Sequence, residues 1–276
     1  MNQDLRPRKR SALRRLGGTA YYTARRYVQW YTGGFSFASE RRAESLAWRA
    51  AQHHTPLLRK LKDVDMQYQY NKIVNLKLAC ARLDGLVLKP GQTFSYWKCI
   101  GKPTRRKGYV DGMVLYCGTF GPGVGGGLCQ LSNLIYWMTL HTPLTVTERY
   151  RHSYDVFPDA NRTQPFGSGA TCVYPYRDLM VRNDTSDTWQ LRVKVGAEEL
   201  EGQWLCTAPP RVEYQMIEKE HRFAREAWGG FSRNNELWRH CRDLITGQEW
   251  EEYVTENHAL TMYVPFLEPA NSENNK

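Results

Sequence analysis

The sequence has no long apolar run. None of its 276 residues belongs to an apolar stretch of about 18 residues or more, so we expect no membrane-spanning helix. The first 30 residues are basic, but arginines interrupt each short apolar run, and the apolar centre of a secretory signal peptide is missing. We therefore expect the chain to stay in the cytoplasm.

Paired cysteines and metal-ligand spacings are also missing. The seven cysteines are odd in number, widely spaced and never arranged as CxxC, which disfavours a disulfide framework or a structural zinc site. The seven histidines show no spacing such as HExxH, and no dinucleotide or phosphate-loop fingerprint occurs. We expect no metal and no cofactor, and a reducing compartment in which most thiols are small buried apolar groups.

The positive charge is concentrated at one end of the chain. Residues 1–62 carry 14 Lys or Arg against 3 acidic residues, and the remaining 214 residues are close to neutral, within a total of +10. Residues 1–35 form a basic arm in which RYVQWY (26–31) interleaves aromatics with arginine, although the helical amphipathicity looks poor. Such an arm favours an anionic surface, and we expect the inner face of a membrane rather than a nucleic acid.

The apolar pattern changes along the chain from helical to strand-like. Helices are expected at 39–52, from 55–56 onward, at 71–83 and at 129–140. Alternating runs predict strands at 86–88, 93–97, 110–118, 144–150, 170–174, 179–183, 189–195, 211–217, 249–254 and 260–266. Two hairpins are expected among them, one from 86–88 and 93–97 and the other from 179–183 and 189–195. A further hairpin turn is expected at Thr246-Gly247, and 119–127 reads as a glycine-rich loop.

These elements predict an α+β fold. Helices at the N-terminus would precede a central helix, which follows the glycine loop and packs on a mostly antiparallel sheet, and the last third would be rich in strands. The expected divisions are a basic arm with helices (1–62), a core domain (63–207), a β-rich extension (208–268) and a polar tail (269–276).

The stretch GGGLCQLSN raises the question of chemistry. Cys129 follows Gly125, Gly126 and Gly127 and begins the central helix. The free N–H groups and the dipole at a helix N-terminus stabilise a thiolate, which would lower the thiol pKa from about 8.5. The glycines allow a substrate to approach the backbone closely, and their N–H groups suit an oxyanion.

A thiol nucleophile needs a base. His152 lies 23 residues after the cysteine, past the strand that returns from the central helix, and so becomes the candidate base. Asp178, Asn183 and Glu148 are candidates to orient its imidazole. Gln130 is placed to donate to a developing oxyanion, and Cys129 with His152 would then form a thiol enzyme.

Two other interpretations stay open. The glycines are equally those of a tight packing corner, with Cys129 as a small buried residue and His152 as a surface histidine. Alternatively, the glycine loop binds a carboxylate or phosphate without catalysis, aided by Arg149, Arg151 and Arg105. The binding hypothesis predicts an ordinary thiol pKa for Cys129.

With these motifs in place, the chain resembles the VanW-like family. The resemblance runs over about residues 68–205 and is carried by YNKIVNLKLACARLDGLVLKPGQTFSYW (70–97), GGGLCQLSNLIYWMTLHTPLTVTER (125–149), His152, FPDAN (157–161) and DLMVRN (178–183). It implies a context in which family members accompany the remodelling of peptidoglycan precursors that confers resistance to vancomycin-type antibiotics. A cell-wall precursor or peptide is therefore the expected partner.

The resemblance also singles out residues. The family pattern contains the three glycines, the cysteine, the glutamine and Glu-Arg-x-x-His, which here are Gly125, Gly126, Gly127, Cys129, Gln130, Glu148, Arg149 and His152. Family members often have Asp-Ala-Thr-Val where this chain has GATC, so that Gly169 stands in place of a carboxylate. Asp178 would then have to orient the histidine.

Overall fold

The computed structural model describes residues 11–58, 65–116, 119–156 and 164–265. Within them, the helices are α1 (Ala12–Thr32), α2 (Met66–Leu83), α3 (Tyr96–Ile100), α4 (Cys129–Leu140) and a 3₁₀ turn, η2 (Arg105–Lys107). The strands are β1 (Trp48–Pro56), β2 (Leu86–Leu88), β3 (Thr93–Ser95), β4 (Asp111–Tyr116), β5 (Thr119–Val124), β6 (Thr145–Glu148), β7 (Tyr154–Asp155), β8 (Met180–Arg182), β9 (Trp189–Val195), β10 (Glu199–Cys206), β11 (Val212–Arg225), β12 (Phe231–Asp243) and β13 (Glu249–Thr261).

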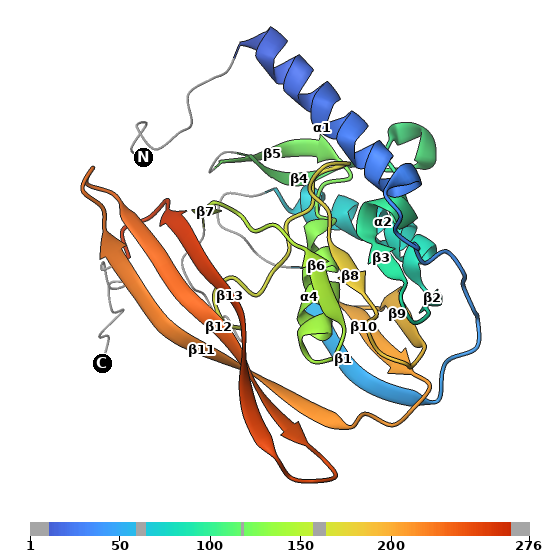
Figure 1. Cartoon of the computed structure of the whole chain (residues 1–276). Helices are drawn as coiled ribbons and strands as arrows, with labels where there is room; N and C mark the ends of the chain where they lie inside the picture. Colours follow the sequence, from blue (N-terminus) through green and yellow to red (C-terminus); the bar gives the residue numbers. More distant parts are fainter. Residues whose placement is uncertain (1–10, 59–64, 117–118, 157–163, 266–276) are drawn as a thin grey trace, which may run out of the picture.

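The strands form four sheets that are antiparallel apart from one short pairing. The orders are β1-β10-β9-β2, β3-β8-β6, β4-β5 and β11-β12-β13-β7, and only β13 and β7 run parallel. Figure 1 shows α4 packed among the first two sheets, with α1 across one side and the long strands β11–β13 extending from the other. The expected α+β class, with its strand-rich last third, is confirmed.

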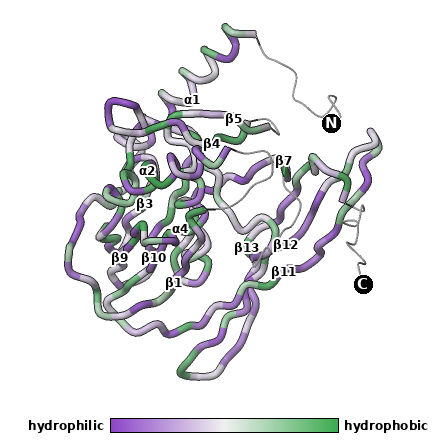
Figure 2. The backbone as a smooth tube through the Cα atoms, turned by 180° about the vertical axis from the view of Figure 1, so that it is seen from behind, coloured by the Kyte–Doolittle hydropathy of each residue, from purple (hydrophilic) through white to green (hydrophobic). Residues whose placement is uncertain are grey.

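The apolar core is centred on α4. Leu131, Leu134 and Ile135 are fully or almost fully buried, because α4 is apolar around most of its circumference. The helix lies close against β10, where a Cβ atom added to Gly202 would be 2.7 Å from Met138 Cε. Figure 2 shows hydrophobic segments gathered around α4, whereas β11–β13 alternate between hydrophilic and hydrophobic positions.

Several predicted elements are confirmed. The helix predicted at 71–83 lies within α2, which begins earlier because the Asp65 side chain accepts from Gln67 N at 2.8 Å and caps it. The helix predicted at 129–140 is α4, and the strand predicted at 189–195 is β9. The strand predicted at 110–118 contains β4, with 117–118 outside the described residues, and the turn at Thr246-Gly247 joins β12 to β13.

The two helices predicted between 39 and 56 are wrong. Residues 48–56 instead form β1, which pairs with β10 from Trp48↔Cys206 to Pro56↔Glu199. Residues 59–64, where the second of these helices would continue, lie outside the described residues. Pairing with a strand of the core outweighs a local helix preference that is worth only tenths of a kcal/mol per residue. The arm at 1–35 also differs from expectation, because most of it is the helix α1.

The predicted hairpins at 86–97 and 179–195 are wrong in their pairing. Both pairs of strands exist, but β2 pairs with β9 and β3 with β8, so each short turn carries the chain from one sheet to another. Residues 119–124, predicted as loop, are β5 and pair with β4. Residues 170–174 form a single bridge, Val173↔Arg177, rather than a strand. The strands β10 and β12 were not predicted, and β11 and β13 are longer than expected.

Among the described helices, none combines the length and the apolar character needed to cross a bilayer.

Candidate functional site

Cys129 begins α4, directly after the glycine turn. The residue is half-buried, and its thiol lies 3.9 Å from the carbonyl oxygen of Cys172, to which it donates. Burial raises the pKa of the Cys129 thiol, and this effect exceeds the stabilisation of the thiolate by nearby hydrogen bonds. The direction is opposite to the lowered pKa that a helix N-terminal nucleophile was expected to have.

The three glycines form a tight packing corner. A Cβ atom on Gly126 would lie 2.2 Å from the backbone carbon of Gly112, and one on Gly127 would lie 2.2 Å from Lys72 Cγ. Gly125 and Gly127 also have φ of 77° and 90°, which favour glycine. The N–H of Gly125 donates to Val110 O at 3.0 Å. The glycines therefore have a structural explanation in close backbone packing.

Three of the oxyanion donors expected near the thiol already have partners: the N–H groups of Gly125 and Gly126 and the Gln130 amide. The N–H of Gly126 donates to Gly123 O at 2.9 Å, and the carbonyl of Gly126 accepts from Asn75 Nδ2 at 2.9 Å. The Gln130 amide donates to Thr55 Oγ1 at 2.8 Å and to the carbonyl of Pro56 at 2.9 Å. Gln130 therefore ties α4 to the end of β1.

His152 lies near the same segment as Cys129. The carbonyl of Tyr150 accepts from Thr171 N at 2.8 Å, and Cys172, the next residue, accepts from the Cys129 thiol. His152 is half-buried, and burial, with Arg177 nearby, lowers the pKa of its imidazole. In the described part of the chain, no hydrogen bond joins His152 to the thiol or to a carboxylate. Its role as a base stays a prediction.

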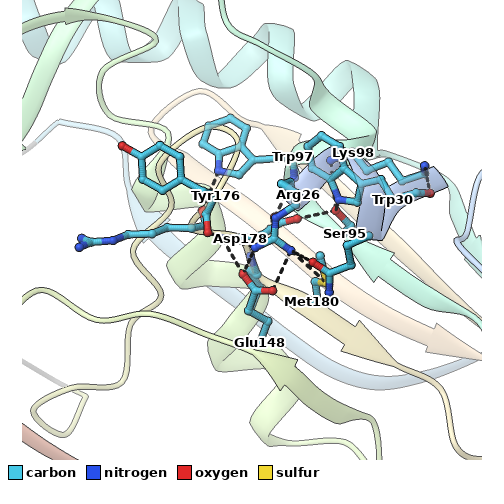
Figure 3. Close-up of polar contacts among 12 residues, drawn as sticks. Arg26, Trp30, Ser95, Trp97, Lys98, Glu148, Tyr176, Asp178 and Met180 are labelled. Atoms are coloured by element: carbon cyan, nitrogen blue, oxygen red, sulfur yellow. Dashed lines mark hydrogen bonds and ion pairs between the residues drawn. The ribbon is translucent and has the colours of Figure 1, made fainter. Parts of the chain in front are cut away.

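Asp178 belongs to a different cluster. It is fully buried, and its carboxylate accepts from Ser95 Oγ at 2.5 Å and from the backbone N–H groups of Trp97 and Leu179, each at 2.9 Å (Figure 3). Burial raises the pKa of Asp178 to about 7 against the opposing effect of these donors. The contacts hold the start of α3 in place and include no histidine.

Glu148 pairs with an arginine that the sequence analysis placed in the basic arm. Arg26, from α1, donates through Nη1 to Glu148 Oε2 at 2.8 Å and through Nη2 to Glu148 Oε1 and to Tyr176 O (Figure 3). Glu148 also accepts from the backbone N–H of Asp178 at 3.1 Å. We call this arrangement the Arg26–Glu148 clamp. No local pattern identifies it, because the two residues lie 122 positions apart.

Arg149 joins the core to the C-terminal sheet. Its guanidinium donates to the carbonyls of Gly169, at 2.9 Å, and Gly167, and reaches Asn257 Oδ1 of β13 at 3.3 Å. It also stacks over the ring of Tyr136, 4.9 Å from the centroid. Each of its three guanidinium nitrogens therefore donates to a partner within the chain, and its role is to hold the segment after β6 against β13.

Arg151 differs from Arg149 because one nitrogen of its guanidinium has no hydrogen-bond partner in the described part of the chain. Its Nη1 atom is buried and makes no hydrogen bond in the described part of the chain. Burial and the neighbouring Arg149 lower the pKa of Arg151, while Glu256 opposes them. A cavity of ≈450 Å³ opens beside it between α4, β6 and the β12–β13 hairpin. Its charged lining residues are Glu148, Arg149, Arg151, Arg239 and Glu256.

Apart from His152, the structure thus divides the main predicted site residues among three places. The cysteine, the glutamine and the glycines lie at the packing corner that begins α4. Asp178 and Glu148 belong to the clamp cluster, although Glu148 also borders the cavity. Arg149 and Arg151 line the cavity, which we call the arginine cleft. Neither Cys129 nor the glycine turn lines this cleft.

Comparison with known proteins gives two relatives and one family. Residues 71–205 match the family described as VanW like protein. The chain is 40% identical over 165 residues to the vancomycin B-type resistance protein VanW of Enterococcus faecalis, and the match covers 60% of each chain. It is 30% identical over 120 residues to the uncharacterized protein YoaR of Bacillus subtilis, covering 44% of this chain and 38% of the relative. The chain thus spans less than two thirds of either relative, and no solved structure matches.

Proposed function

We propose that this chain, a member of the VanW-like family through residues 71–205, binds an anionic cell-wall precursor in the arginine cleft. The single observation that carries the proposal is the buried Nη1 of Arg151, which has no hydrogen-bond partner in the described residues. A buried guanidinium N–H without an acceptor is costly, and a carboxylate or phosphate oxygen would complete it.

The surroundings of Arg151 favour an anion. Arg149 adds a second positive charge, and its position is fixed by carbonyl groups and Asn257 rather than by an acid. Of the two acids in the lining, Glu148 is already neutralised by Arg26. The site would therefore offer a ligand carboxylate or phosphate an excess of positive charge. Its geometry is fixed, so few side chains would have to become ordered on binding.

The context of the ligand comes from the relatives. The Enterococcus faecalis relative is a vancomycin B-type resistance protein. The family resemblance implies a context in which the peptides of peptidoglycan precursors are remodelled. These peptides end in a carboxylate, and the lipid-linked or nucleotide-linked precursors also carry phosphate. Both groups suit the two arginines, so we assign the chain an accessory role in that resistance, by binding such a precursor.

Catalysis by a thiol has weaker support from the same contacts. The pKa of Cys129 is raised rather than lowered, and Gln130 and two of the glycines direct their donors into the fold. A nucleophilic Cys129 with His152 as base stays the alternative prediction. It differs from binding in what it requires of the thiol, which makes the two separable by experiment.

Calorimetric titration with a short acyl-peptide bearing a free C-terminal carboxylate, and separately with inorganic phosphate, tests the proposal. Arg151→Gln should weaken binding of the preferred probe by about tenfold or more, and Arg151→Lys should restore it only in part, since an ammonium lacks the planar fork. Arg242→Gln, which removes an exposed arginine of β12 paired with Glu213, is the matched control and should bind normally. Equal binding by wild type and Arg151→Gln would overturn the proposal.

Alkylation by iodoacetamide as a function of pH tests the alternative. With Cys129→Ala subtracted to isolate this thiol, the raised pKa of the half-buried cysteine predicts slow labelling with an apparent pKa above about 8.5. An apparent pKa well below that value, together with loss of a resistance phenotype in both Cys129→Ala and His152→Ala, would favour the thiol enzyme instead.

A further inference from the structure

The first half of α1 projects from the body of the molecule. Residues 11–17 are all exposed, whereas the second half is fixed by the Arg26–Glu148 clamp and by Trp30, which is buried and donates to Ser95 Oγ at 3.1 Å. Figure 1 shows the helix running out past the edge of the β4–β5 sheet, with its N-terminal turns away from the other elements.

Apart from the Ser11 cap, whose hydroxyl accepts from Arg14 N at 3.3 Å, this projecting half has little packing to keep it helical. It contains Gly17 and Gly18, and a Cβ atom added to either would meet nothing within 4 Å, so neither glycine is required by close packing. Glycine within a helix costs about 1 kcal/mol relative to alanine, and short helices without tertiary contacts are marginal in water. A helix of this kind is stable when a surface covers it.

The uncovered side of α1 is apolar. Six exposed residues recur at intervals of three or four and so form one stripe along the helix, which we call the α1 stripe: Leu13, Leu16, Ala20, Ala24, Tyr27 and Tyr31. Leu13 and Leu16 are 83% and 70% exposed, which is unusual for two neighbouring leucines on one helix face. The stripe is offset by roughly a quarter turn from Arg26 and Trp30, which face the body.

Positive charge surrounds the apolar end of the stripe. Arg14 and Arg15 are exposed beside Leu13 and Leu16, and neither side chain has a hydrogen-bond or ion-pair partner among the described residues. The ten residues before α1 add three arginines and one lysine against one aspartate. Tyrosines occupy the other end of the stripe, where the Tyr27 hydroxyl bonds the Tyr174 hydroxyl at 2.6 Å and Lys98 Nζ lies 4.0 Å from the Tyr31 ring centroid, so this end also contacts the body. Leucines, flanking cations and tyrosines are the composition of helices that lie in the headgroup region of a bilayer.

We propose that α1 is an interfacial helix that docks the protein on an anionic lipid surface, with the α1 stripe turned into the headgroup–acyl boundary. The arginines beside it contact lipid phosphates. The helix lies on the membrane and does not cross it. The clamp transmits the attachment to the core, because Arg26 fixes the second half of the same helix. The inference is independent of the proposed function, since the stripe and the arginine cleft share no residue.

Sedimentation of the full chain with vesicles tests this proposal. Wild type should pellet with vesicles of phosphatidylglycerol and phosphatidylcholine, and at least about tenfold less with phosphatidylcholine alone or at high salt. Leu13→Glu with Leu16→Glu should reduce the partition coefficient by at least about tenfold, because it removes two leucine side chains from the lipid and adds charge of the wrong sign. Both positions are exposed, so the fold is expected to survive.

Matched variants separate the stripe from general surface effects. Ile245→Glu makes the same kind of change at a residue that is 76% exposed in the β12–β13 turn, and it should leave vesicle binding unchanged. Arg14→Gln with Arg15→Gln should weaken binding several-fold, whereas Lys102→Gln with Arg106→Gln, an equal loss of charge on another exposed surface, should not.

Three outcomes would overturn the inference. The first is equal pelleting of wild type and the leucine variant, and the second is equal pelleting of the two charge variants. The third is a concentration-dependent dimer in sedimentation velocity, without vesicles, that the leucine variant abolishes, since the stripe would then face a second copy. The Arg151→Gln variant should bind vesicles like wild type. A failure of the ligand-binding proposal for the arginine cleft can therefore be distinguished from a failure of the lipid-binding proposal for α1.

Discussion

The core and the C-terminal sheet are built from different kinds of buried residue. Around α4 the buried side chains are overwhelmingly apolar, and Trp204 is fully enclosed. In β11–β13 the buried apolar residues are only three among those described: Leu237, Cys241 and Ala259. The buried polar or charged residues of this sheet outnumber them: Ser232, Arg233, Asn235, Asn257 and Thr261.

The difference shows how the sheet is attached. Asn235 donates to the carbonyl of Phe166 at 2.7 Å, Asn257 donates to Asn235 Oδ1 at 2.9 Å, and Arg149 donates to Asn257. Hydrogen bonds of this kind hold a position but add little net stability. The core is therefore stabilised by apolar burial, whereas the joint with the sheet is polar. The arginine cleft opens at that joint, where polar groups are available to a ligand.

The largest effect expected is on the packing corner of the core. Gly126→Ala should lower the free energy of unfolding by about 3 kcal/mol, because its Cβ would meet the backbone of Gly112 at 2.2 Å and neither segment can move freely. Urea denaturation measures the change. Gly121→Ala, in β5, is the control, since its Cβ would meet nothing within 4 Å and should change stability by less than about 1 kcal/mol. A similar loss of unfolding free energy in both variants would contradict the prediction that close backbone packing at Gly126 causes the effect.

A pH-dependent contribution from Asp178 is comparable in total size, but it is spread over about three pH units. Its pKa is near 7 in the folded protein and about 4 when unfolded, so the folded state binds more protons between those values. Stability from this group therefore falls as pH rises from about 4 to about 7, with a slope approaching 1.4 kcal/mol per pH unit. Denaturation of wild type and Asp178→Asn at several pH values should give a difference that changes only in this window. A difference in the free energy of unfolding that is the same at every pH would contradict the raised pKa of the buried Asp178.

At the polar joint, the effect should be smaller and local. Asn257→Ala removes the partner of two buried atoms, Arg149 Nη1 and Asn235 Oδ1, and should cost about 1 to 2 kcal/mol. Limited proteolysis should then cut faster near residues 207–211, where the chain enters the sheet. The matched change Asn234→Ala removes an asparagine from the neighbouring strand whose side chain bonds Ser232 and His258, and proteolysis should be unchanged.

The smallest effect belongs to the charged face of the C-terminal sheet. Glu251→Gln breaks the cross-strand pair with Lys219, whose partners are 42% and 38% exposed. Such a pair is worth less than about 1 kcal/mol and is screened by salt. Thermal denaturation at low salt should show a shift of a few degrees at most, and the shift should vanish at high salt. A loss as large as that of Gly126→Ala would mean that the sheet depends on its ion pairs.

The sequence predicted elements where one strong local signal was sufficient. The helix of residues 129–140 combines an apolar run with a glycine turn before it and Pro143 after it, and β9 has an uninterrupted alternation. Partners were not predictable in the same way. The strands β2 and β3 look like a hairpin, but their partners β9 and β8 lie about a hundred residues away. A short turn between two strands limits which strands can pair but does not determine their partners.

The candidate site shows the same limit. The GGGLCQ stretch was found because it is local, but its glycines face Gly112 and Lys72, which no spacing relates to them. The Arg26–Glu148 clamp was missed entirely, because an arginine in a basic segment gives no sign of pairing with an acid 122 residues away. The unpartnered Nη1 of Arg151 is likewise a property of three-dimensional enclosure and not of sequence.

The Arg26–Glu148 clamp also has a mechanical consequence. The helix that it holds has 21 residues and is about 30 Å long, and the clamp grips it within two turns of its C-terminal end. A straight rod fixed near one end behaves as a lever, so a small rotation of its free end becomes a torque on Glu148. Since Glu148 also borders the arginine cleft, whatever holds the free end of α1 sets the direction in which the cleft faces.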